Sequence, residues 1–375
     1  MSGSLTRVAG VVAVASALAL GVVAPPARAV PRKPTALVVP TQFPTIQSAV
    51  DAAAPGATIQ VLAGTYVEQV RIIKSLTIVG AGMDSTVIKV PAAPQRDNKT
   101  KEINIVDISA GASVSMSRLT VSGPGSGTCK KGAIGAGIRV RDDAHLDLRF
   151  AAVRDIHDTP FAGCFHTAEG ILVGDVPGPI ATLAIDHSEI TNYQGAGIVI
   201  LGFGSTATIT HNTVTGPGPA RGVSTDGIEF PVGSVGTIAH NTVSGNICAS
   251  GDPTCGADWF TQFQHAGIAA GGWGPGTVIT DNLVFGNQVG LLVGESDEIS
   301  DNRMVGNDFF GLGVFDGTFV IDGGQISGGG GGLWAIADSA NTNVALNGVT
   351  FSGLSGPEIE KVECCGFTAT VTTSP

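Results

Sequence analysis

Short apolar segments alternate with polar corners along most of this chain, and two kinds of segment recur in a fixed order. Four copies share the pattern Ile-x-x-Asn-x-Val/Met, and they begin at Ile209, Ile238, Ile279 and Ile299. Between them, a Gly followed by Ile or Leu recurs eight times from Gly137 to Gly332. Repeats of this length are typical of a solenoid, whose stacked turns bury one continuous core. The pattern therefore predicts an all-β solenoid of short strands.

The spacing of the repeats differs between the two arcs of each turn. The Asn of each copy defines a column, in which weaker copies place Ser117, Ala151, Ser188, Gly324 and Asn347. The separation from a repeat Gly to the next residue of this Asn column is 12 to 18 residues. The separation from the Asn column to the following Gly ranges from 8 to 26 residues. Neutral drift would scatter long loops around the whole turn, whereas insertions on one face are how solenoids build a binding surface. We therefore predict a binding flank on the variable arc.

The N-terminal part of the chain shows a different pattern. Residues 30–40 form a Pro-rich lead-in, and a helix is predicted near residues 45–54, with apolar residues spaced i, i+3, i+4 and i+7 before Pro55-Gly56. Such a helix covers unpaired strand edges at the end of a coil. We predict that the coil occupies residues 41–353 and that residues 354–375 form a C-terminal cap.

Residues 1–29 have the features of a secretory signal peptide. Arg7 precedes an apolar run from Val8 to Ala24, and Ala27-Arg28-Ala29 matches a small-residue cleavage site. We therefore expect a secreted, extracellular protein. Removing the two arginines of this segment takes the formal net charge from −11 to −13. An acidic surface argues against nucleic acid and anionic membranes as partners, and we expect a monomer.

Six cysteines in an exported protein indicate disulfides. Cys129 and Cys164 lie in the long loops of consecutive turns, so we expect them to pair. Cys248 and Cys255 share one long loop and can pair locally. Cys364 and Cys365 are left over, and cross-pairing with the loop cysteines stays open. Zinc is the rival interpretation, but no matching Cys and His spacing supports it.

The chain resembles a known superfamily at its first predicted turns. Phe43-Pro-Thr-Ile-Gln-Ser-Ala-Val-Asp-Ala-Ala, Gly64-Thr-Tyr-Val-Glu and Leu76-Thr-Ile-Val-Gly-Ala-Gly resemble the first turns of the right-handed parallel β-helix, or pectin-lyase-like, superfamily. With the repeats, the resemblance covers residues 40–353. It implies three parallel sheets in roughly 9–11 turns, with the Asn column at a corner and the Gly-Ile strand on the first sheet.

In this superfamily the substrate usually lies in a groove along the first sheet, walled by the loops that precede it. Members include pectate and alginate lyases, polygalacturonases, pectin methylesterases, epimerases, phage tailspikes and non-catalytic surface proteins. The resemblance therefore implies a carbohydrate ligand without selecting a reaction.

Candidate catalytic residues lie beside the repeat glycines. Equivalent positions in successive turns form columns, and the position before each Gly holds Glu169 and Asp226, two turns apart and roughly 9–10 Å between backbones. Carboxylates about 6.5–9.5 Å apart suit an inverting glycosidase. Glu229 shares the outer surface with Asp226, and His265 precedes the next strand. The plainer interpretation of all four is a set of solvated turn residues.

Ser224-Thr225-Asp226-Gly227-Ile228-Glu229 is similar to the Asn-Thr-Asp-Gly strand motif of polygalacturonases, whose Asp is catalytic. Only Asp226 carries over by that match. The next turn has Gln264-His265-Ala266 where that family has paired Asp residues, and its Gly-His-Gly and Arg-Ile-Lys motifs are missing. The motifs of the catalytic turns of pectin methylesterases do not appear either. The sequence thus matches no specific enzyme family.

A polysaccharide lyase is the alternative, and it needs a base and usually Ca²⁺ or another neutralising cation. Lys130, Arg139 and Arg221 lie on the variable arc or the first sheet and are candidate contacts for an acidic sugar, and a shared calcium ion among the carboxylates is the possible cofactor. Trp259 and Phe260, in the longest loop, can stack on sugar rings or anchor that loop.

The Asn column has a structural interpretation. Asn212, Asn241, Asn282 and Asn302 are predicted to stack inside a corner, because a ladder of side-chain amides satisfies its own hydrogen bonds. The residues before them, His211, His240, Asp281 and Asp301, are then exposed corner residues. No metal site is predicted there, since His and Asp occur in different turns.

Together these observations favour a secreted enzyme that cleaves or modifies a polysaccharide or cell-wall glycan in the groove of the first sheet. Hydrolysis by Asp226 and Glu169 is placed slightly ahead of calcium-assisted β-elimination. The alternative is a non-catalytic β-helix that binds a glycan or a surface.

Overall fold

The computed structural model describes residue 3 and residues 36–98, 100–126, 133–159, 161, 168–252, 265–271, 276–294 and 298–375. Residues 36–375 form one compact unit. The described part of this unit holds 35 strands and one helix, and the strands form three sheets. None of its helices combines the length and apolar character needed to cross a membrane. The prediction of an all-β fold with three parallel sheets is confirmed.

Sheet A contains the strands that end before the Asn column. Its 13 strands are β1 (Leu37–Val39), β2 (Thr58–Val61), β5 (Leu76–Val79), β8 (Ser113–Ser117), β11 (His145–Arg149), β14 (Thr182–Asp186), β17 (Thr206–Thr210), β20 (Val235–Ala239), β23 (Val278–Thr280), β26 (Glu298–Ser300), β29 (Thr318–Asp322), β32 (Thr342–Asn347) and β35 (Ala369–Ser374).

Sheet B follows the Asn corner in each turn. Its 11 strands are β3 (Gly64–Val67), β6 (Thr86–Lys89), β9 (Thr120–Ser122), β12 (Ala152–Ile156), β15 (Glu189–Tyr193), β18 (Thr213–Ala220), β21 (Thr242–Cys248), β24 (Leu283–Phe285), β27 (Arg303–Val305), β30 (Gln325–Ser327) and β33 (Thr350–Ser352).

Sheet C contains the Gly-Ile strands and corresponds to the predicted first sheet. Its 11 strands are β4 (Val70–Ile72), β7 (Asn104–Ile108), β10 (Ala136–Val140), β13 (Glu169–Val173), β16 (Ala196–Leu201), β19 (Asp226–Val232), β22 (Ala266–Ala270), β25 (Val289–Gly294), β28 (Phe310–Phe315), β31 (Gly331–Ala337) and β34 (Ile359–Glu363).

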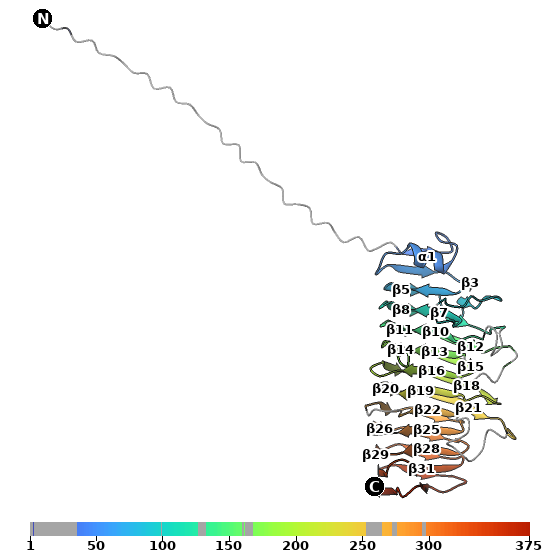
Figure 1. The fold of residues 1–375 in the computed structure, drawn as a ribbon, viewed down its shortest axis with the longest axis vertical. Coiled ribbons are helices and arrows are strands. Elements are labelled where there is room, and N and C mark those ends of the chain that lie inside the picture. The colour runs from blue at the N-terminus through green and yellow to red at the C-terminus, as the bar shows by residue number, and fades with distance from the viewer. Residues whose placement is uncertain are drawn as a thin grey trace. The chain divides into compact units, whose positions relative to one another are not determined.

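Each turn runs from sheet C to sheet A to sheet B, and the turns stack along one axis (Figure 1). Paired strands are parallel, and equivalent apolar residues align: Ile209 pairs with Ile238, and Ile228 with Ile268. These four side chains are fully buried. Because every turn contributes such residues to the same columns, the core runs the length of the coil.

Helix α1 (Ile46–Ala52) lies at the N-terminal end of the coil (Figure 1). Thr45 caps it, since its side chain accepts a hydrogen bond from the Ser48 amide. The carboxylate of Glu68 also accepts bonds from the amides of Ile46 and Gln47, at 2.9 and 2.8 Å. Ile46 is buried with the rest of the apolar face, so the helix covers the first turn of the core.

The coil extends beyond the predicted bounds of residues 41–353 at both ends. Strand β1, in the predicted lead-in, pairs with β2. In the predicted C-terminal cap, β34 pairs with β31 and β35 pairs with β32. The sequence pattern missed these strands because they lack the Asn and Gly-Ile signals. Residues 354–375 therefore add a further turn to the coil.

The predicted Asn ladder is confirmed at the corner between sheets A and B. Each amide oxygen accepts bonds from the backbone and side chain of the preceding Asn, as in the 2.9 Å and 3.0 Å bonds from Asn212 to Asn241. All four asparagines are buried, and Ser188 begins the ladder by donating its backbone N–H to Asn212 at 2.9 Å. His211, His240, Asp281 and Asp301 are exposed beside it, as predicted.

A second ladder at the corner between sheets B and C was not predicted. The backbone amide of Asn246 donates to the Asn287 side chain at 3.1 Å, and that of Asn287 donates to Asn307 at 3.1 Å. The hydroxyl of Tyr193, which is fully buried, donates to Asn246 Oδ1 at 2.8 Å and ends this ladder. Two amide ladders thus brace two of the three corners.

The long connections between strands lie at one corner. Apart from the connection from β1 to β2, which contains helix α1, four connections between described strands exceed ten residues, and they link β6 to β7, β9 to β10, β12 to β13 and β21 to β22. Every one of them leaves sheet B and enters sheet C. The insertions therefore emerge along one flank of the coil, beside sheet C, as the spacing predicts.

The repeat glycines are required by the close approach of successive turns. A Cβ added at Gly290 would lie 2.4 Å from the carbonyl oxygen of Gly311 and 2.8 Å from the Asn307 amide nitrogen. We expect Gly290→Ala to lower the free energy of unfolding by about 2–3 kcal/mol, because the added methyl overpacks the core. Urea unfolding followed by circular dichroism measures this change.

Gly82→Ala is the control for this substitution. A Cβ at Gly82 meets only the Ser85 side chain, at 3.5 Å, which is ordinary contact. This variant is expected to change stability by less than about 0.5 kcal/mol. Equal effects of the two variants would contradict the steric explanation of the glycine column.

Candidate functional site

The strand register places the predicted carboxylates in the predicted columns on sheet C. Glu169 begins β13 and pairs with Ala136, while Asp226 begins β19 and pairs with Ala196 on the intervening strand β16. Glu229 pairs with Val199 in the neighbouring outward column. Two strand steps separate Glu169 from Asp226, about 9–10 Å between backbones. The site therefore spans three turns beside the flank of long loops.

The carboxyl group of Glu169 is shielded from solvent. Its side chain is 5% exposed, and the backbone amide of Ala196, one turn on, donates a hydrogen bond to Oε2. Gly195 makes room for it, because a Cβ there would lie 2.6 Å from both carboxylate oxygens. Burial raises the pKa of Glu169 to about 8, and the charge of Asp226 adds to this effect. Glu169 is therefore mostly protonated at pH 7.

Asp226 has a similar environment two turns further along. It is 6% exposed, and the backbone amide of Ala266 donates to Oδ1 at 2.7 Å. The Ser224 hydroxyl donates to Oδ2 at 3.4 Å. Burial raises the pKa of Asp226 to about 7, although these two hydrogen bonds favour the ionised form. Near neutral pH, Asp226 is thus the more readily ionised member of the pair.

Glu229 is half-buried and lines a cavity of about 170 Å³ on the outer face of sheet C. Apolar side chains make up most of the wall, among them Phe230, Leu292 and Phe315. Burial raises the pKa of Glu229 well above its usual range, and the charges of Asp226 and Glu169 raise it further. The cavity extends from Glu229 toward strands β22, β25 and β28, and neither Glu169 nor Asp226 lines it.

His265 precedes strand β22 and is 1% exposed. Its Nδ1 lies 2.6 Å from the Thr225 hydroxyl oxygen, and its buried Nε2 has no hydrogen-bond partner among the described residues. Burial lowers the pKa of His265 to about 4, so the ring is neutral at pH 7. His265 directly precedes Ala266, whose backbone amide donates a hydrogen bond to Asp226. The neutral imidazole of His265 is a group that can accept or donate a proton.

Arg139 does not have the role predicted from the sequence. It is 1% exposed and forms ion pairs with Asp175 and, at 3.4 Å, with Glu102. It also donates to the carbonyl oxygens of Val140 and Leu172. Its charge is therefore neutralised inside the protein, and Arg139 is not available to a substrate.

Of the other predicted substrate contacts, Arg221 is exposed on the connection from β18 to β19 and donates to the Ser250 carbonyl oxygen at 2.8 Å. It lies on the loop flank, where a substrate contact remains a prediction. Lys130, Trp259 and Phe260 lie outside the described residues.

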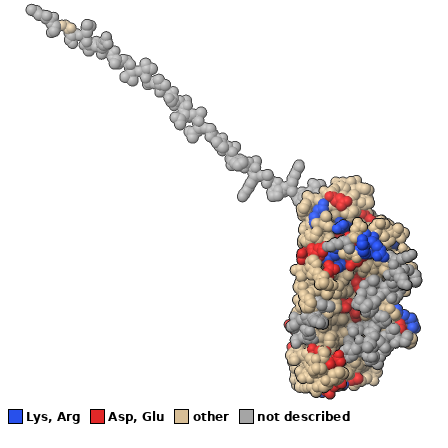
Figure 2. Space-filling model, in the orientation of Figure 1, with Lys and Arg blue, Asp and Glu red and all other residues tan. Residues whose placement is uncertain are grey.

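Sheet C carries another pocket, lined by polar residues, that the sequence interpretation missed. It measures about 200 Å³ and lies at the N-terminal turns, lined among others by Arg71, Arg96, Asn104 and Asp107. Most of the basic surface on the face in Figure 2 also lies over these turns. Arg71 and Asp107 stand in the same outward column as Glu229. The signal was missed because no Gly-Ile pair marks these two turns.

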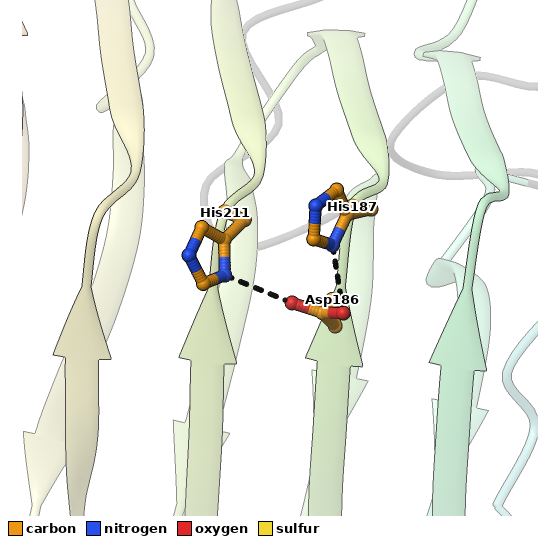
Figure 3. Close-up of side chains that lie close together, drawn as sticks. All are labelled: Asp186, His187 and His211. Carbon is orange, nitrogen blue, oxygen red and sulfur yellow. Dashed lines mark hydrogen bonds and ion pairs between the residues drawn. The ribbon is translucent and has the colours of Figure 1, made fainter.

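Two groups of three possible metal ligands bring their ligand atoms within 4.8 Å of one another among the described residues. One consists of Asp186, His187 and His211 (Figure 3). Glu169, Asp226 and Glu229 do not form such a group, so their present geometry gives no support to a calcium ion shared by all three.

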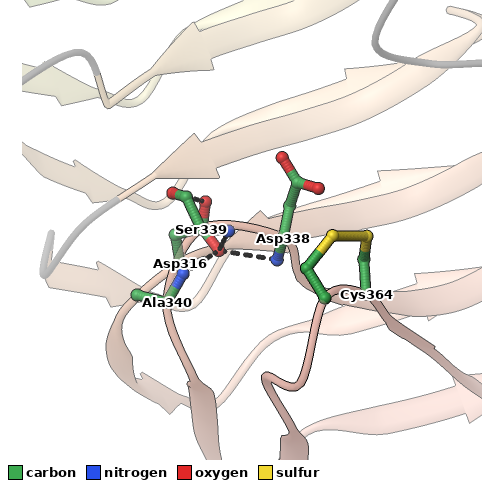
Figure 4. The surroundings of a disulfide bond; sticks show 6 residues. Asp316, Asp338, Ser339, Ala340 and Cys364 are labelled. Atoms are coloured by element: carbon green, nitrogen blue, oxygen red, sulfur yellow. Dashed lines mark hydrogen bonds between the residues drawn. A yellow bond between two sulfur atoms is a disulfide. The ribbon is translucent and has the colours of Figure 1, made fainter.

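The other group contains Asp338 and the two adjacent cysteines. Cys364 and Cys365 are joined by a disulfide, so their sulfur atoms are not thiolate ligands (Figure 4). The nearby Asp316 carboxylate accepts backbone hydrogen bonds from residues 338–340 and serves as a corner brace.

The remaining cysteine predictions concern the loops. Cys248 is disulfide-bonded. Cys129, Cys164 and Cys255 lie outside the described residues, so the pairings Cys129–Cys164 and Cys248–Cys255 stay predictions.

The raised pKa of Glu169 makes the stability of the protein depend on pH. Its folded-state pKa, about 8, lies above the ordinary value of 4.5. The folded state therefore holds a proton that the unfolded state releases, and this contribution to stability is complete below about pH 4.5 and is lost as pH rises through about 8. Glu169→Gln stays neutral and keeps an acceptor for the Ala196 amide, so this loss disappears.

We expect the variant to gain on the order of 3 kcal/mol relative to the wild type between pH 5 and pH 8. Melting temperatures measured across this range test the expectation. Glu298→Gln, at an exposed position of β26, is the control. Parallel pH profiles for the wild type and Glu169→Gln would show that this carboxyl is not protonated in the folded protein.

The stacked parallel turns define the class of the fold as a parallel β-helix. It is a right-handed parallel β-helix: the family model described as "Right handed beta helix region" matches residues 169–349, and the predicted resemblance is confirmed. No curated protein sequence is significantly similar to the chain.

Several solved structures share this fold. The A-module of the mannuronan C-5 epimerase AlgE4 from Azotobacter vinelandii has 16% identity and a TM-score of 0.50, with 87% of this chain and 94% of that chain covered. Tailspike protein 2 of Escherichia coli O157:H7 bacteriophage CAB120 has 17% identity and a TM-score of 0.54, covering 80% of this chain and 40% of the tailspike. The Agl-KA catalytic domain has 17% identity and a TM-score of 0.51, with 92% and 69% covered. At these identities the likeness establishes the fold alone.

Proposed function

We propose that this protein is a secreted enzyme that hydrolyses glycosidic bonds of a polysaccharide lying along the outer face of sheet C. The observation that carries the proposal is the pair of buried carboxyl groups, Glu169 and Asp226, two turns apart in one column. Both have raised pKa values, and perturbed carboxyl groups of this kind cluster at functional sites.

The two environments suit different roles. Glu169, mostly protonated at neutral pH, is the general acid that gives its proton to the departing glycosidic oxygen. Asp226, once ionised, removes a proton from a water molecule whose oxygen attacks the anomeric carbon as the glycosidic bond breaks. The backbones lie about 9–10 Å apart. Parallel side chains on this spacing keep the carboxyl groups in the range of about 6.5–9.5 Å that leaves space for that water, so we expect inversion at the anomeric carbon.

Two further observations support a secreted, carbohydrate-active protein. Residues 1–29 have the sequence features of a cleaved signal peptide. The structural neighbours include a mannuronan epimerase module and a phage tailspike. Their names motivate the choice of polysaccharides for the assay, while the reaction is argued from the carboxyl pair.

β-Elimination is the second candidate reaction, and His265 is the observation in its favour. Its ring is neutral at pH 7, and its buried Nε2 has no hydrogen-bond partner among the described residues, so it is the base assigned in this alternative to remove the proton α to a uronate carboxyl. This route differs from hydrolysis in its product, which carries a carbon–carbon double bond.

The test is to incubate the protein with a panel of neutral and uronate-containing polysaccharides, with and without EDTA. Hydrolysis produces reducing ends without ultraviolet absorbance, whereas β-elimination produces both. Reducing ends alone, insensitive to EDTA, are the expected result. Saturable binding without any product would contradict the proposal and favour a non-catalytic glycan-binding β-helix.

A further inference from the structure

Three histidines form a row at the corner between sheets A and B, away from sheet C. His187, His211 and His240 each follow the last residue of a sheet A strand in three successive turns. Their φ angles are 48°, 56° and 58°, so all three adopt the left-handed conformation of this corner. Their rings stack at 4.9 and 5.0 Å between centroids, and each side chain is about half exposed, at 51%, 48% and 50%.

The Asp186 carboxylate lies between the first two histidines and contacts both (Figure 3). One of its carboxylate oxygens lies 2.7 Å from His187 Nδ1, and the other lies 3.1 Å from His211 Nδ1. The Thr210 hydroxyl donates to the second oxygen at 3.0 Å. Two imidazole nitrogens and a carboxylate therefore converge on one small region at the surface.

The coil does not require these residue types at this corner. The corner requires a residue that tolerates a positive φ, and the next two turns use Asp281 and Asp301, with φ of 54° and 52°. The position of Asp186 is held by Thr210 in the following turn, which pairs with it in sheet A. The turns with histidines thus carry a ligand set that the fold alone does not explain.

We propose that Asp186, His187 and His211 form a binding site for a divalent transition-metal ion of the zinc class. Imidazole nitrogen and carboxylate oxygen bind Zn²⁺ at about 2.0–2.2 Å, so neighbouring ligand atoms in a tetrahedral set lie roughly 3.3 Å apart. His187 Nδ1 and His211 Nδ1 lie 2.7 and 3.1 Å from the two different oxygens of Asp186. One ligand atom from each of the three residues lies within 4.8 Å of the other two, so small side-chain shifts bring the set to the tetrahedral spacing. The half-exposed rings leave a fourth position to water, and two nitrogen ligands favour Zn²⁺, Ni²⁺ or Cu²⁺ over Ca²⁺.

His240 and Asp281 continue the row but do not complete the site. His240 stacks on His211, and its Nδ1 lies 4.0 Å from the Asp281 carboxylate. Among the described residues, Asp186 pairs with His187 and His211, and no hydrogen bond or ion pair joins it to His240. It therefore serves as the matched control, with the same residue type, corner conformation and exposure as His211.

The experiment is isothermal titration calorimetry of the protein with Zn²⁺, repeated with Ca²⁺. A separate titration with Co²⁺ is followed by visible absorption, which reports imidazole coordination. Asn replaces each histidine in turn, because Asn tolerates the left-handed conformation and its amide is a weak ligand. We expect one Zn²⁺ ion with a Kd below about 100 μM and no competition from Ca²⁺.

His187→Asn, His211→Asn and Asp186→Asn are each expected to weaken Zn²⁺ binding by at least about tenfold. His240→Asn is expected to change the Kd by less than about threefold. Circular dichroism and melting temperature verify that each variant is folded. No binding below millimolar Zn²⁺, or binding unaffected by His187→Asn and His211→Asn, would overturn the proposal.

Discussion

Asp226→Asn is expected to lower the rate of polysaccharide hydrolysis by about 10²–10⁴-fold without loss of the fold. Asn has the same shape, and its amide oxygen still accepts the hydrogen bond from the Ala266 amide that holds Asp226 at 2.7 Å. It cannot remove a proton from water, so the general base is lost. The measurement is kcat from the release of reducing ends on the polysaccharide that the wild type degrades.

Glu189→Gln is the control for this substitution, because Glu189 is an exposed carboxylate on sheet B. It is expected to leave kcat unchanged. Glu169→Gln is expected to reduce hydrolysis as strongly as Asp226→Asn on a polysaccharide. On an aryl glycoside with a good leaving group, the Glu169 variant recovers activity, because such a leaving group departs without a proton.

The pH profile provides a separate test of the two roles. Hydrolysis rises as Asp226 ionises, near pH 7, and falls as Glu169 loses its proton, near pH 8. The wild type is therefore expected to show an optimum near neutral pH, and Glu169→Gln to lose the alkaline limb. Full activity of Asp226→Asn would remove the basis of the proposed mechanism.

The columns of sheet C could be predicted because a solenoid converts sequence spacing into position. Once each repeat Gly marks the start of a strand, the residue before it falls into one column, whatever the length of the preceding loop. For this reason Glu169 and Asp226 share a column although long and variable segments separate the repeats. The existence of the columns required only strand pairing, which the Gly-Ile pattern determines.

Arg139 shows what such spacing does not determine. Its column was predicted, but its burial depends on Asp175 and Glu102, which come from connections on either side of its own turn. An arginine that forms ion pairs with two carboxylates is neutralised, and the repeat pattern does not show that loop residues supply these carboxylates. Predictions of side-chain role therefore fail first where loops supply the partners.

The second ladder had a signal in the sequence. Asn246, Asn287 and Asn307 each follow a member of the first ladder by five residues. The Asp186 and His187 pair had no such signal: the repeat places Ser188 in the Asn column, but it does not show which side chains of the next turn lie beside the two residues before it. The register, which pairs Asp186 with Thr210, brings it beside His211.

Asn241→Leu is expected to lower the free energy of unfolding by at least about 4 kcal/mol, because it interrupts the ladder in the middle of the coil. Asn241 is 1% exposed. Its Nδ2 donates to the carbonyl oxygens of Ile209 and Ala239 at 2.8 and 3.0 Å, and its Oδ1 accepts two bonds from Asn212. Leucine fills a similar volume but satisfies none of these groups, and each buried unpaired group costs about 1–3 kcal/mol.

Asn347→Leu separates this cost from a general effect of the substitution. Asn347 lies near the C-terminal end of sheet A, where it pairs with Asp322 and therefore stands two positions before the ladder column. Its side chain bonds only exposed partners, Asp322 and Ser374, at 2.7 and 2.8 Å. Water can replace these partners, so the loss is expected to stay below about 1 kcal/mol. Urea unfolding measures both variants. If Asn241→Leu proved no more costly than Asn347→Leu, the corner would be held by backbone pairing and apolar packing, and the amide ladder would contribute little to stability.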